Sequence, residues 1–249
     1  MSMSSVMLSL IVLTCVFGGA LIGIYLHAIL PEHHLGSDSK DIVKLGMGLV
    51  GTMAALVLGL LVASAKGSYD AQSTDLTQMS ANIGMLDRAL ALYGPETKEI
   101  RAMLRVAIGR MTDQMWSSVS PVPPNAAGGE ILFENIQGLA PKNDTQRSLQ
   151  SQALSIAVDI GKTRWLMYEQ AISSVSLPLL VVLVLWLTVI FISFGLFAPF
   201  NATVVSSLLV SALSVSGAIF LILEMYSPYS GVIQISSAPL RAAISQSVQ

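Results

Sequence analysis

The stretch LPLLVVLVLWLTVIFISFGLFAPFNATVVSSLLVSALSVSGAIFLILE, residues 177–224, decides the fold of this chain. Its one charged residue is Glu224, which is also the only Asp, Glu, Lys or Arg between positions 173 and 240. The APFN segment divides the apolar run, because Pro199 ends one helix and Asn201 can cap the next. Each half has roughly the 20 apolar residues that a bilayer-spanning helix needs. The stretch therefore predicts two membrane spans, 177–198 and 203–223, joined by a tight turn.

Two further apolar runs lie near the N-terminus, at about Val6–Leu30 and Ile42–Ala65. The first is too long for a signal peptide, no basic residue precedes it, and no small-residue cleavage site follows, so we interpret it as a span. The whole chain is 53% hydrophobic and 11% charged, whereas soluble domains average about 25% charged residues. The sequence thus predicts an integral membrane protein in a lipid bilayer. A net charge of -2 gives no reason to expect nucleic-acid binding, and the single Cys15 excludes an intramolecular disulfide.

Basic residues concentrate in the central region. Residues 66–172 hold ten of the thirteen Lys and Arg residues, and basic loops favour the cytoplasmic side. We therefore expect the central region and both termini to lie on the cytoplasmic side. The expected organisation is all-α: spans one and two in 1–65, a cytoplasmic helical domain in 66–172 inserted before spans three and four in 173–224, and a cytoplasmic tail in 225–249.

Helical periodicity runs through the central region. Apolar residues alternate at spacings of three and four, at Leu76, Met79, Ile83, Leu86, Leu90 and Tyr93. Because Gly67 is the only breaker before them, one helix is expected from the second span to Tyr93, ending at Gly94-Pro95. A second helix should start at Pro95, after which SPVPPNAAGG (120–129) reads as a loop. A short helix is expected over 130–140 and a long one from Asn143 or Asp144 into the third span, with a short amphipathic helix near 237–244.

Five segments carry a resemblance to a known family: GLLVASAKGSYDAQ (59–72), MLDRALALYGPE (85–96), KTRWLMYEQ (162–170), LPLLVVLVLWLTVIFISFGLFAPFNATV (177–204) and SGAIFLILEMYSPYSGVIQISSAPLR (216–241). They resemble a family of bacterial membrane proteins called bestrophin-like, catalogued as a domain of unknown function. The resemblance implies the helix order of bestrophin chloride channels, which are pentamers with a pore lined by the second span. Here that span has no aromatic residue, and an acidic calcium clasp is not recognisable. The resemblance therefore implies topology and channel activity but no site residues.

Small residues recur at every fourth position of the second span, at Gly51, Ala55, Gly59 and Ala63. This spacing lets helix backbones approach closely. It favours tight packing within or between subunits, and the alternative is that the same face lines a pore. Gly19 and Gly23 in the first span invite the packing interpretation.

The fourth span carries a polar stripe that falls in one sector of the helix. Its members are Thr203, Ser206, Ser207, Ser211, Ser214, Gly217 and Glu224. Hydroxyls can bond to backbone carbonyls or to a neighbouring helix, or they can border a hydrated path. Because an acidic residue in a membrane segment is a candidate functional site, Glu224 has three interpretations: an ion pair with Arg164, Lys66 or Arg241, an interfacial residue reaching water, or a residue at a pore mouth.

Other polar groups are weaker candidates. His33 and His34 stand beside Glu32 and Asp38, but adjacent histidines in a loop lack a fixed geometry, so no metal site is predicted. Lys98, Arg101 and Arg105 form a basic row at helical spacing, interpreted as a solvated face. The chain shows no nucleophile–base pair, Walker loop, haem signature or zinc motif. Neither an enzyme nor a cofactor is therefore expected.

The functional prediction is an oligomeric ion channel, anion-conducting by analogy with bestrophins. Four spans with little internal polarity are too few for one subunit to enclose a water path, so we expect a homo-oligomer whose remaining partners are lipid and ions. The alternative is a membrane scaffold or signalling protein that conducts nothing. A secondary transporter ranks third, because broken-helix repeats and buried charge sets are absent from the sequence.

Overall fold

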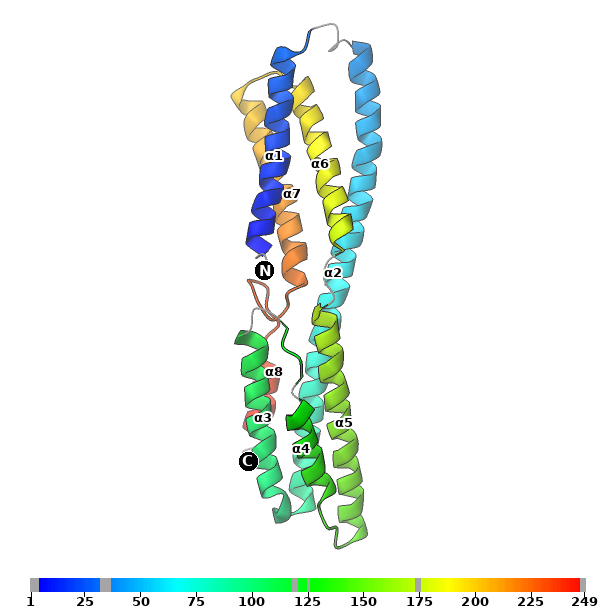
Figure 1. Cartoon of the computed structure of the whole chain (residues 1–249), viewed down its shortest axis with the longest axis vertical. Coiled ribbons are helices and arrows are strands. Elements are labelled where there is room, and N and C mark those ends of the chain that lie inside the picture. Colours follow the sequence, from blue (N-terminus) through cyan, green and yellow to red (C-terminus); the bar gives the residue numbers. More distant parts are fainter. Residues whose placement is uncertain (1–4, 32–36, 118–120, 125, 173–175, 247–249) are drawn as a thin grey trace. The chain divides into compact units, whose positions relative to one another are not determined.

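The computed structural model describes residues 5–31, 37–117, 121–124, 126–172 and 176–246. In these residues all regular secondary structure is helical (Figure 1). The chain divides into two compact units. The first unit comprises Met1–Gly67 and Ser174–Tyr226, and the second comprises Ser68–Ser173 and Ser227–Gln249. The helices are α1 (Ser5–Ile29), α2 (Ser37–Tyr93), the 3-10 turn η2 (Pro95–Thr97), α3 (Lys98–Ser117), α4 (Ala126–Gln137), α5 (Asp144–Ile172), α6 (Leu177–Phe197), α7 (Ala202–Met225) and α8 (Ala238–Gln246).

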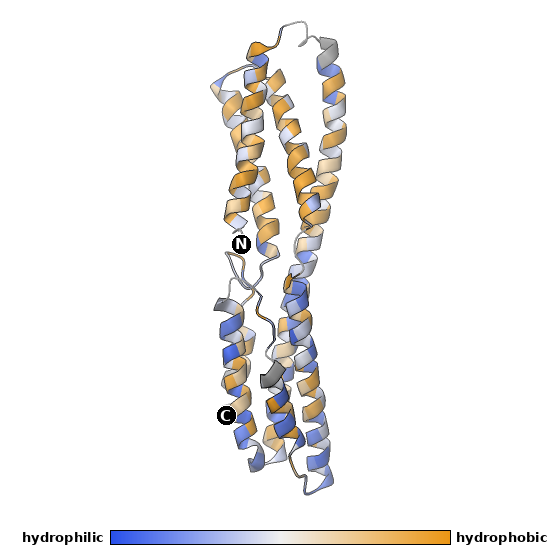
Figure 2. Cartoon of the chain, viewed as in Figure 1, coloured by the Kyte–Doolittle hydropathy of each residue, from blue (hydrophilic) through white to orange (hydrophobic). Residues whose placement is uncertain are grey.

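Four helices are long and apolar enough to cross a membrane: α1, α2, α6 and α7. Figure 2 shows the apolar residues gathered in α1, α6, α7 and the first part of α2. The all-helical fold class is therefore confirmed in the described residues, and each of the four predicted spans falls in a helix that is long and apolar enough to cross a membrane. The turn between α6 and α7 has the predicted chemistry, because the Asn201 side chain accepts a hydrogen bond from the Val204 N–H at 2.8 Å.

Three helices of the first unit pack side by side. α1 contacts both α6 and α7 along its length (Figure 1). Their shared core contains Val16, Leu183 and Ile219, all fully buried, and α2 adds Ala54 and Leu61 to it. Aliphatic side chains thus fill the interior of the unit, and further aliphatic side chains remain exposed on its outer surface.

The long central helix is confirmed as one element. α2 runs for 57 residues from Ser37 to Tyr93, and Gly67 does not interrupt it. It ends at the predicted point, where Gly94 adopts a φ of 137° that side-chain-bearing residues disfavour. The Thr97 hydroxyl then donates to the Gly94 carbonyl at 2.8 Å, which fixes the turn into α3.

The second unit is a helical bundle built from the later part of α2 with α3, α4, α5 and α8. The predicted stripe of α2 is buried there, as are the apolar faces of α3 and α5, with core residues Leu76, Met79, Ile83, Leu86, Leu90, Ile100, Leu104, Ile108, Ile156 and Met167. The tail joins this core through Leu240, while the Trp116 indole N–H donates to the Ile235 carbonyl at 2.9 Å.

Some helix boundaries differ from the prediction. The helix expected from Pro95 begins as the 3-10 turn η2 and becomes α3 at Lys98. α4 begins at Ala126, four residues before the expected start at Glu130, and ends at Gln137 rather than at Ala140, so it includes Gly128 and Gly129. Leu132 and Ile136 anchor α4 on the core, and this packing outweighs the low helix propensity of the two glycines. The predicted junction between α5 and the third span includes 173–175, which lie outside the described residues.

Candidate functional site

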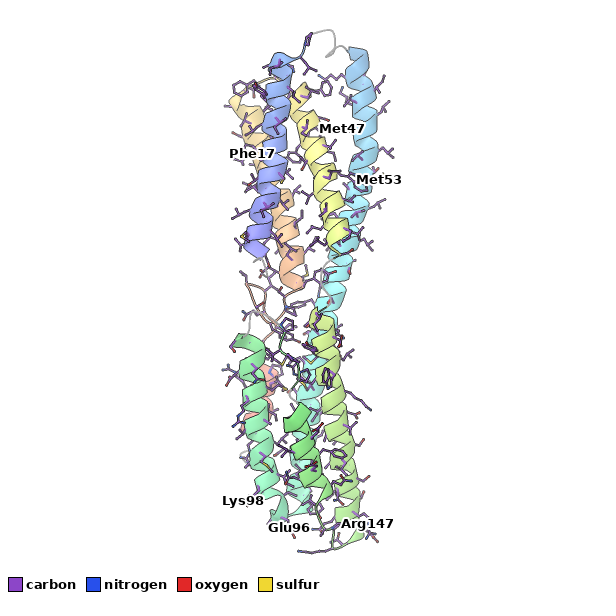
Figure 3. All side chains as sticks on the ribbon, viewed as in Figure 1. Phe17, Met47, Met53, Glu96, Lys98 and Arg147 are labelled. Atoms are coloured by element: carbon purple, nitrogen blue, oxygen red, sulfur yellow. The ribbon has the colours of Figure 1, made fainter. Side chains whose placement is uncertain are left out.

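The membrane part of α2 has three differently covered faces. Met47, Val50, Ala54, Val57, Leu58, Leu61 and Ala65 form the face that packs against the rest of the first unit. A second face carries bulky exposed side chains, including Leu45, Leu49, Met53, Leu56 and Leu60. Met47 lies on the side toward α6, whereas Met53 points away from it (Figure 3). The third face carries the predicted small residues.

That small-residue face is uncovered in the single chain. Ala55, Gly59 and Ala63 are exposed and Gly51 is partly exposed. No heavy atom within the described residues lies within 4 Å of a Cβ placed at Gly51 or Gly59, nor at Gly48 on the same side. Within the chain, α2 therefore packs through a different face. Of the interpretations of the stripe, close packing inside the subunit receives no contact from the described residues.

The glycines of α1 behave in the opposite way. A Cβ at Gly19 would lie 3.0 Å from Cγ2 of Thr188, and one at Gly23 would overlap the carbonyl oxygen of Ile192. On the facing helix, a Cβ at Gly195 would overlap the carbonyl oxygen of Ala20. The packing interpretation of Gly19 and Gly23 is thus confirmed, and α1 and α6 approach at backbone distance. Gly195 was missed in the sequence, because a single glycine in an aliphatic run has no spacing to identify it.

The hydroxyl stripe of α7 faces outward. Thr203, Ser206, Ser207, Ser211 and Ser214 are all exposed. Ser214 satisfies its own hydroxyl by donating to the Val210 carbonyl at 2.9 Å. The buried serine of this helix is Ser216, which the stripe did not include, and its hydroxyl donates to the Ser9 carbonyl of α1 at 2.6 Å. The uncovered hydroxyls therefore remain available to a partner helix or to water.

Glu224 differs from the residues of this stripe, because it is buried whereas they are exposed. The residue is 3% exposed, so it does not simply reach water from the single chain. Glu224 also takes part in a polar or electrostatic interaction in the structure. Nearby in sequence, the Tyr226 hydroxyl lies 3.0 Å from the Ser64 hydroxyl, which links the end of α7 to α2. Since a buried charge requires compensation, Glu224 acts first as part of the packed end of α7.

The remaining polar candidates are structural or fall outside the described residues. Residues 32–36, which include His33 and His34, are outside them. His27 contacts the facing helix, where its Nδ1 lies 2.8 Å from the Leu196 carbonyl. No group of three or more His, Cys, Asp or Glu residues that could hold a metal occurs in the described part of the chain.

The basic row on α3 is held partly by an ion pair that the sequence did not indicate. Arg101 binds Asp87 of α2 in a bidentate manner, with Nε–Oδ1 and Nη2–Oδ2 distances of 2.8 and 2.7 Å. These hydrogen bonds raise the pKa of Arg101. Lys98 remains exposed (Figure 3), and Arg105 donates to the Arg101 carbonyl. The row therefore does not present three free cations.

Comparison with protein families gives one match over most of the chain. A model described as "Bestrophin-like: Bestrophin-like domain" matches residues 14–240. No curated protein and no solved structure matches the chain. The matched region includes the uncovered face of α2, the hydroxyl stripe of α7 and Glu224.

Proposed function

This chain belongs to the bestrophin-like family, and from this membership and the faces of its first unit we propose that it is one subunit of an oligomeric ion channel. The channel lies in a bacterial inner membrane, with both termini and the helical domain on the cytoplasmic side. By analogy with the channels that give the family its name, it conducts anions.

The observation that carries the proposal is the poor covering of α2. In the most apolar 18-residue segment of α2, 11% of the residues are buried. The corresponding values are 33% for α1, 24% for α6 and 28% for α7. Lipid can cover the bulky leucines of this helix, but Gly51, Ala55 and Gly59 offer it little apolar side-chain surface. Small residues are typical of sites where another helix backbone approaches, or where side chains leave room for a water path.

The stripe on α7 gives independent support. Five exposed hydroxyl residues share one side of an otherwise aliphatic helix, and polar side chains in membrane helices generally face a protein interior or a water-filled cavity. A ring of subunits would enclose such faces, whereas a single chain leaves them on its surface.

A non-conducting scaffold is the second candidate, and it has a specific observation in its favour. Several hydroxyls of the first unit are satisfied by their own helices: Ser214 donates to the Val210 carbonyl, Thr52 to the Leu49 carbonyl at 2.7 Å, and Thr188 to the Val184 carbonyl at 2.7 Å. Such hydroxyls do not require water as a hydrogen-bond partner. An oligomer joined through the same faces could therefore pack without a water path between its subunits, and it would not conduct ions.

Purified protein in planar bilayers under a salt gradient separates these candidates. Discrete currents with a reversal potential on the anion side are expected. Empty bilayers give the background current. The Gly46→Leu variant is the matched control for any substitution on the small-residue face of α2, such as Gly59→Leu. A correctly assembled oligomer without currents would favour the scaffold, and a cation-side reversal potential would overturn anion conduction.

The orientation is tested by cysteine labelling. Ser151 of α5 is exposed, and Ser151→Cys in a Cys15→Ser background offers one accessible thiol. An impermeant maleimide should label it in inverted vesicles and not in intact cells. Labelling from outside intact cells would contradict the cytoplasmic placement of the helical domain.

A further inference from the structure

The second unit contains a cavity of about 650 Å³ between α3, α4 and α5. This volume lies in the usual range of about 300–1,000 Å³ for small-molecule sites. Its floor belongs to the core of the bundle, through Ile83 of α2 and Leu104 and Ile108 of α3, which are all buried. Phe133 adds an aromatic ring to the wall. Most of the lining is therefore apolar and is held by the packed core.

Two glycines widen the cavity without serving the packing of the chain. Gly161 lies in the middle of α5 and Gly129 in α4, and both line the cavity. No heavy atom of the described residues lies within 4 Å of a Cβ placed at either position. A glycine inside a helix costs about 1 kcal/mol relative to alanine. Because no neighbour within the chain requires a glycine here, the space itself is what these positions provide.

A cation lies in the lining of this apolar space. Arg164 of α5 is half-buried, and its Nη2 donates to the Val122 carbonyl at 3.2 Å. No carboxylate pairs with it among the described residues. Burial lowers the pKa of Arg164, because removal from water disfavours the charged form. A guanidinium has five N–H donors, so most of its hydrogen-bonding capacity remains for another group.

The nearest phenol does not neutralise this arginine. Tyr229 interacts electrostatically with Arg164, but burial raises the pKa of Tyr229 far above its usual value. The phenol is therefore neutral at physiological pH. Its hydroxyl also has no hydrogen-bond partner among the described residues.

Three other charged side chains line the cavity, and all are exposed: Arg110 of α3, with Glu130 and Glu134 of α4. Water screens these charges more than it screens Arg164. The lining thus combines an apolar floor, a half-buried cation and exposed charges of both signs. An oxyanion at Arg164 would form charge-assisted hydrogen bonds, which are about twice as strong as neutral ones.

We propose that this cavity binds a small amphipathic anion, whose apolar or aromatic body lies on the floor of Ile83, Leu104 and Ile108 and whose carboxylate-type head binds Arg164. The proposal does not depend on channel activity, since it concerns binding within the second unit. Charge complementarity favours this occupant over an apolar segment of a second copy, which would leave Arg164 without a counter-ion.

The test uses the full chain in lipid nanodiscs and isothermal titration calorimetry. The probe is 2-naphthoate, its neutral counterpart is 2-naphthamide, and empty nanodiscs provide the blank. The native protein should bind the carboxylate at least about tenfold more tightly than the amide, because only the anion gains the charge-assisted bond. Equal binding of the two compounds, or no binding of either, would overturn the proposal.

Variants locate the site. Arg164→Gln should abolish the preference for the carboxylate while leaving weak amide binding, and Arg164→Lys should retain part of the preference. Arg147→Gln is the matched control, because Arg147 is an exposed arginine on the same helix outside the cavity lining (Figure 3). Gly161→Phe should fill the space and remove binding of both compounds, whereas Gly161→Ala should keep it.

Native mass and thermal unfolding accompany each variant. If Arg164→Gln does not fold, the Gly161→Phe and Gly161→Ala pair decides, since a Cβ at position 161 meets open space. Unchanged binding in Gly161→Phe would place the probe elsewhere and contradict the proposal. If the native protein gives no binding heat and Gly161→Phe dissociates the oligomer, then a second copy fills the cavity and the proposal is wrong.

Discussion

The glycines of α1 and the glycines of α2 share one sequence pattern and meet opposite surroundings. Gly19 and Gly23 lie at backbone distance from α6, whereas Gly51 and Gly59 have no neighbour within 4 Å in the described chain. Both pairs sit in apolar spans of the same unit. The spacing therefore indicates that close approach is allowed, and the tertiary structure decides whether the subunit itself uses it.

The difference also separates two levels of organisation. The α1–α6 contact completes the fold of one chain. The α2 face leaves a surface that, in the proposed channel, other subunits or a water path would cover. Substitutions on the first face should change folding, and substitutions on the second should change assembly, so each prediction below tests one side of this division.

The largest effect is expected for Gly23→Leu. The added side chain would meet the Ile192 backbone, which cannot move aside as a flexible side chain can. We expect destabilisation of roughly 3 kcal/mol or more, at the upper end of overpacking costs, measured by unfolding in mixed micelles. Gly18→Leu is the control, because Gly18 lies on the same helix with no described heavy atom within 4 Å. Equal stability of the two variants would contradict the α1–α6 contact.

Glu224→Gln comes next. The side chain is buried at the end of α7, and loss of its charge should weaken a charged hydrogen bond or ion pair by about 2 kcal/mol. Thermal unfolding measures this, with subunit number expected to stay unchanged. The double variant with Lys66→Gln tests the candidate partner in the same unit, and partial rescue of stability would identify it. Normal stability together with a changed anion permeability would instead assign Glu224 to the ion path.

Gly59→Leu tests the uncovered face directly. Within the subunit the change should alter stability by less than about 1 kcal/mol, since leucine is a better helix former and meets open space. The native mass of the complex should fall, because a leucine blocks close approach between subunits. Gly46→Leu places the same substitution on another side of α2, also in open space, and should keep the native mass. A normal mass for Gly59→Leu would remove the packing role of this face.

The smallest effect on folding is expected for the paired change Ser211→Ala and Ser214→Ala. Both residues are exposed and Ser214 bonds only to its own helix within the described chain, so stability should change by less than about 0.5 kcal/mol. Single-channel conductance should fall if these hydroxyls border the water path. Ser216→Ala is the contrasting variant, because it removes the buried bond to Ser9 and should cost about 1 kcal/mol. Unchanged conductance in the paired variant would place the path away from α7.

Much of the fold could be predicted from the sequence, because the features that determine it are local. The long apolar runs, the cap at Asn201, the end of α2 at Gly94 and the stripe from Leu76 to Leu90 each depend on neighbours a few residues apart. α4 was predicted to start four residues too late, since packing of Leu132 and Ile136 overrides the low helix propensity of two glycines. The Asp87–Arg101 pair was missed because it joins two helices.

The sequence by itself determined the helices, the four apolar spans and the family, because length, periodicity and local motifs record them directly. The tertiary structure alone decided which faces are covered. It placed Gly23 against α6, left Gly59 uncovered, buried Glu224 apart from the exposed hydroxyls, and opened a cavity beside Arg164. Burial depends on atoms brought together from distant positions in the chain. The same spacing of small residues along a helix occurs in the sequence whether or not another helix packs against it.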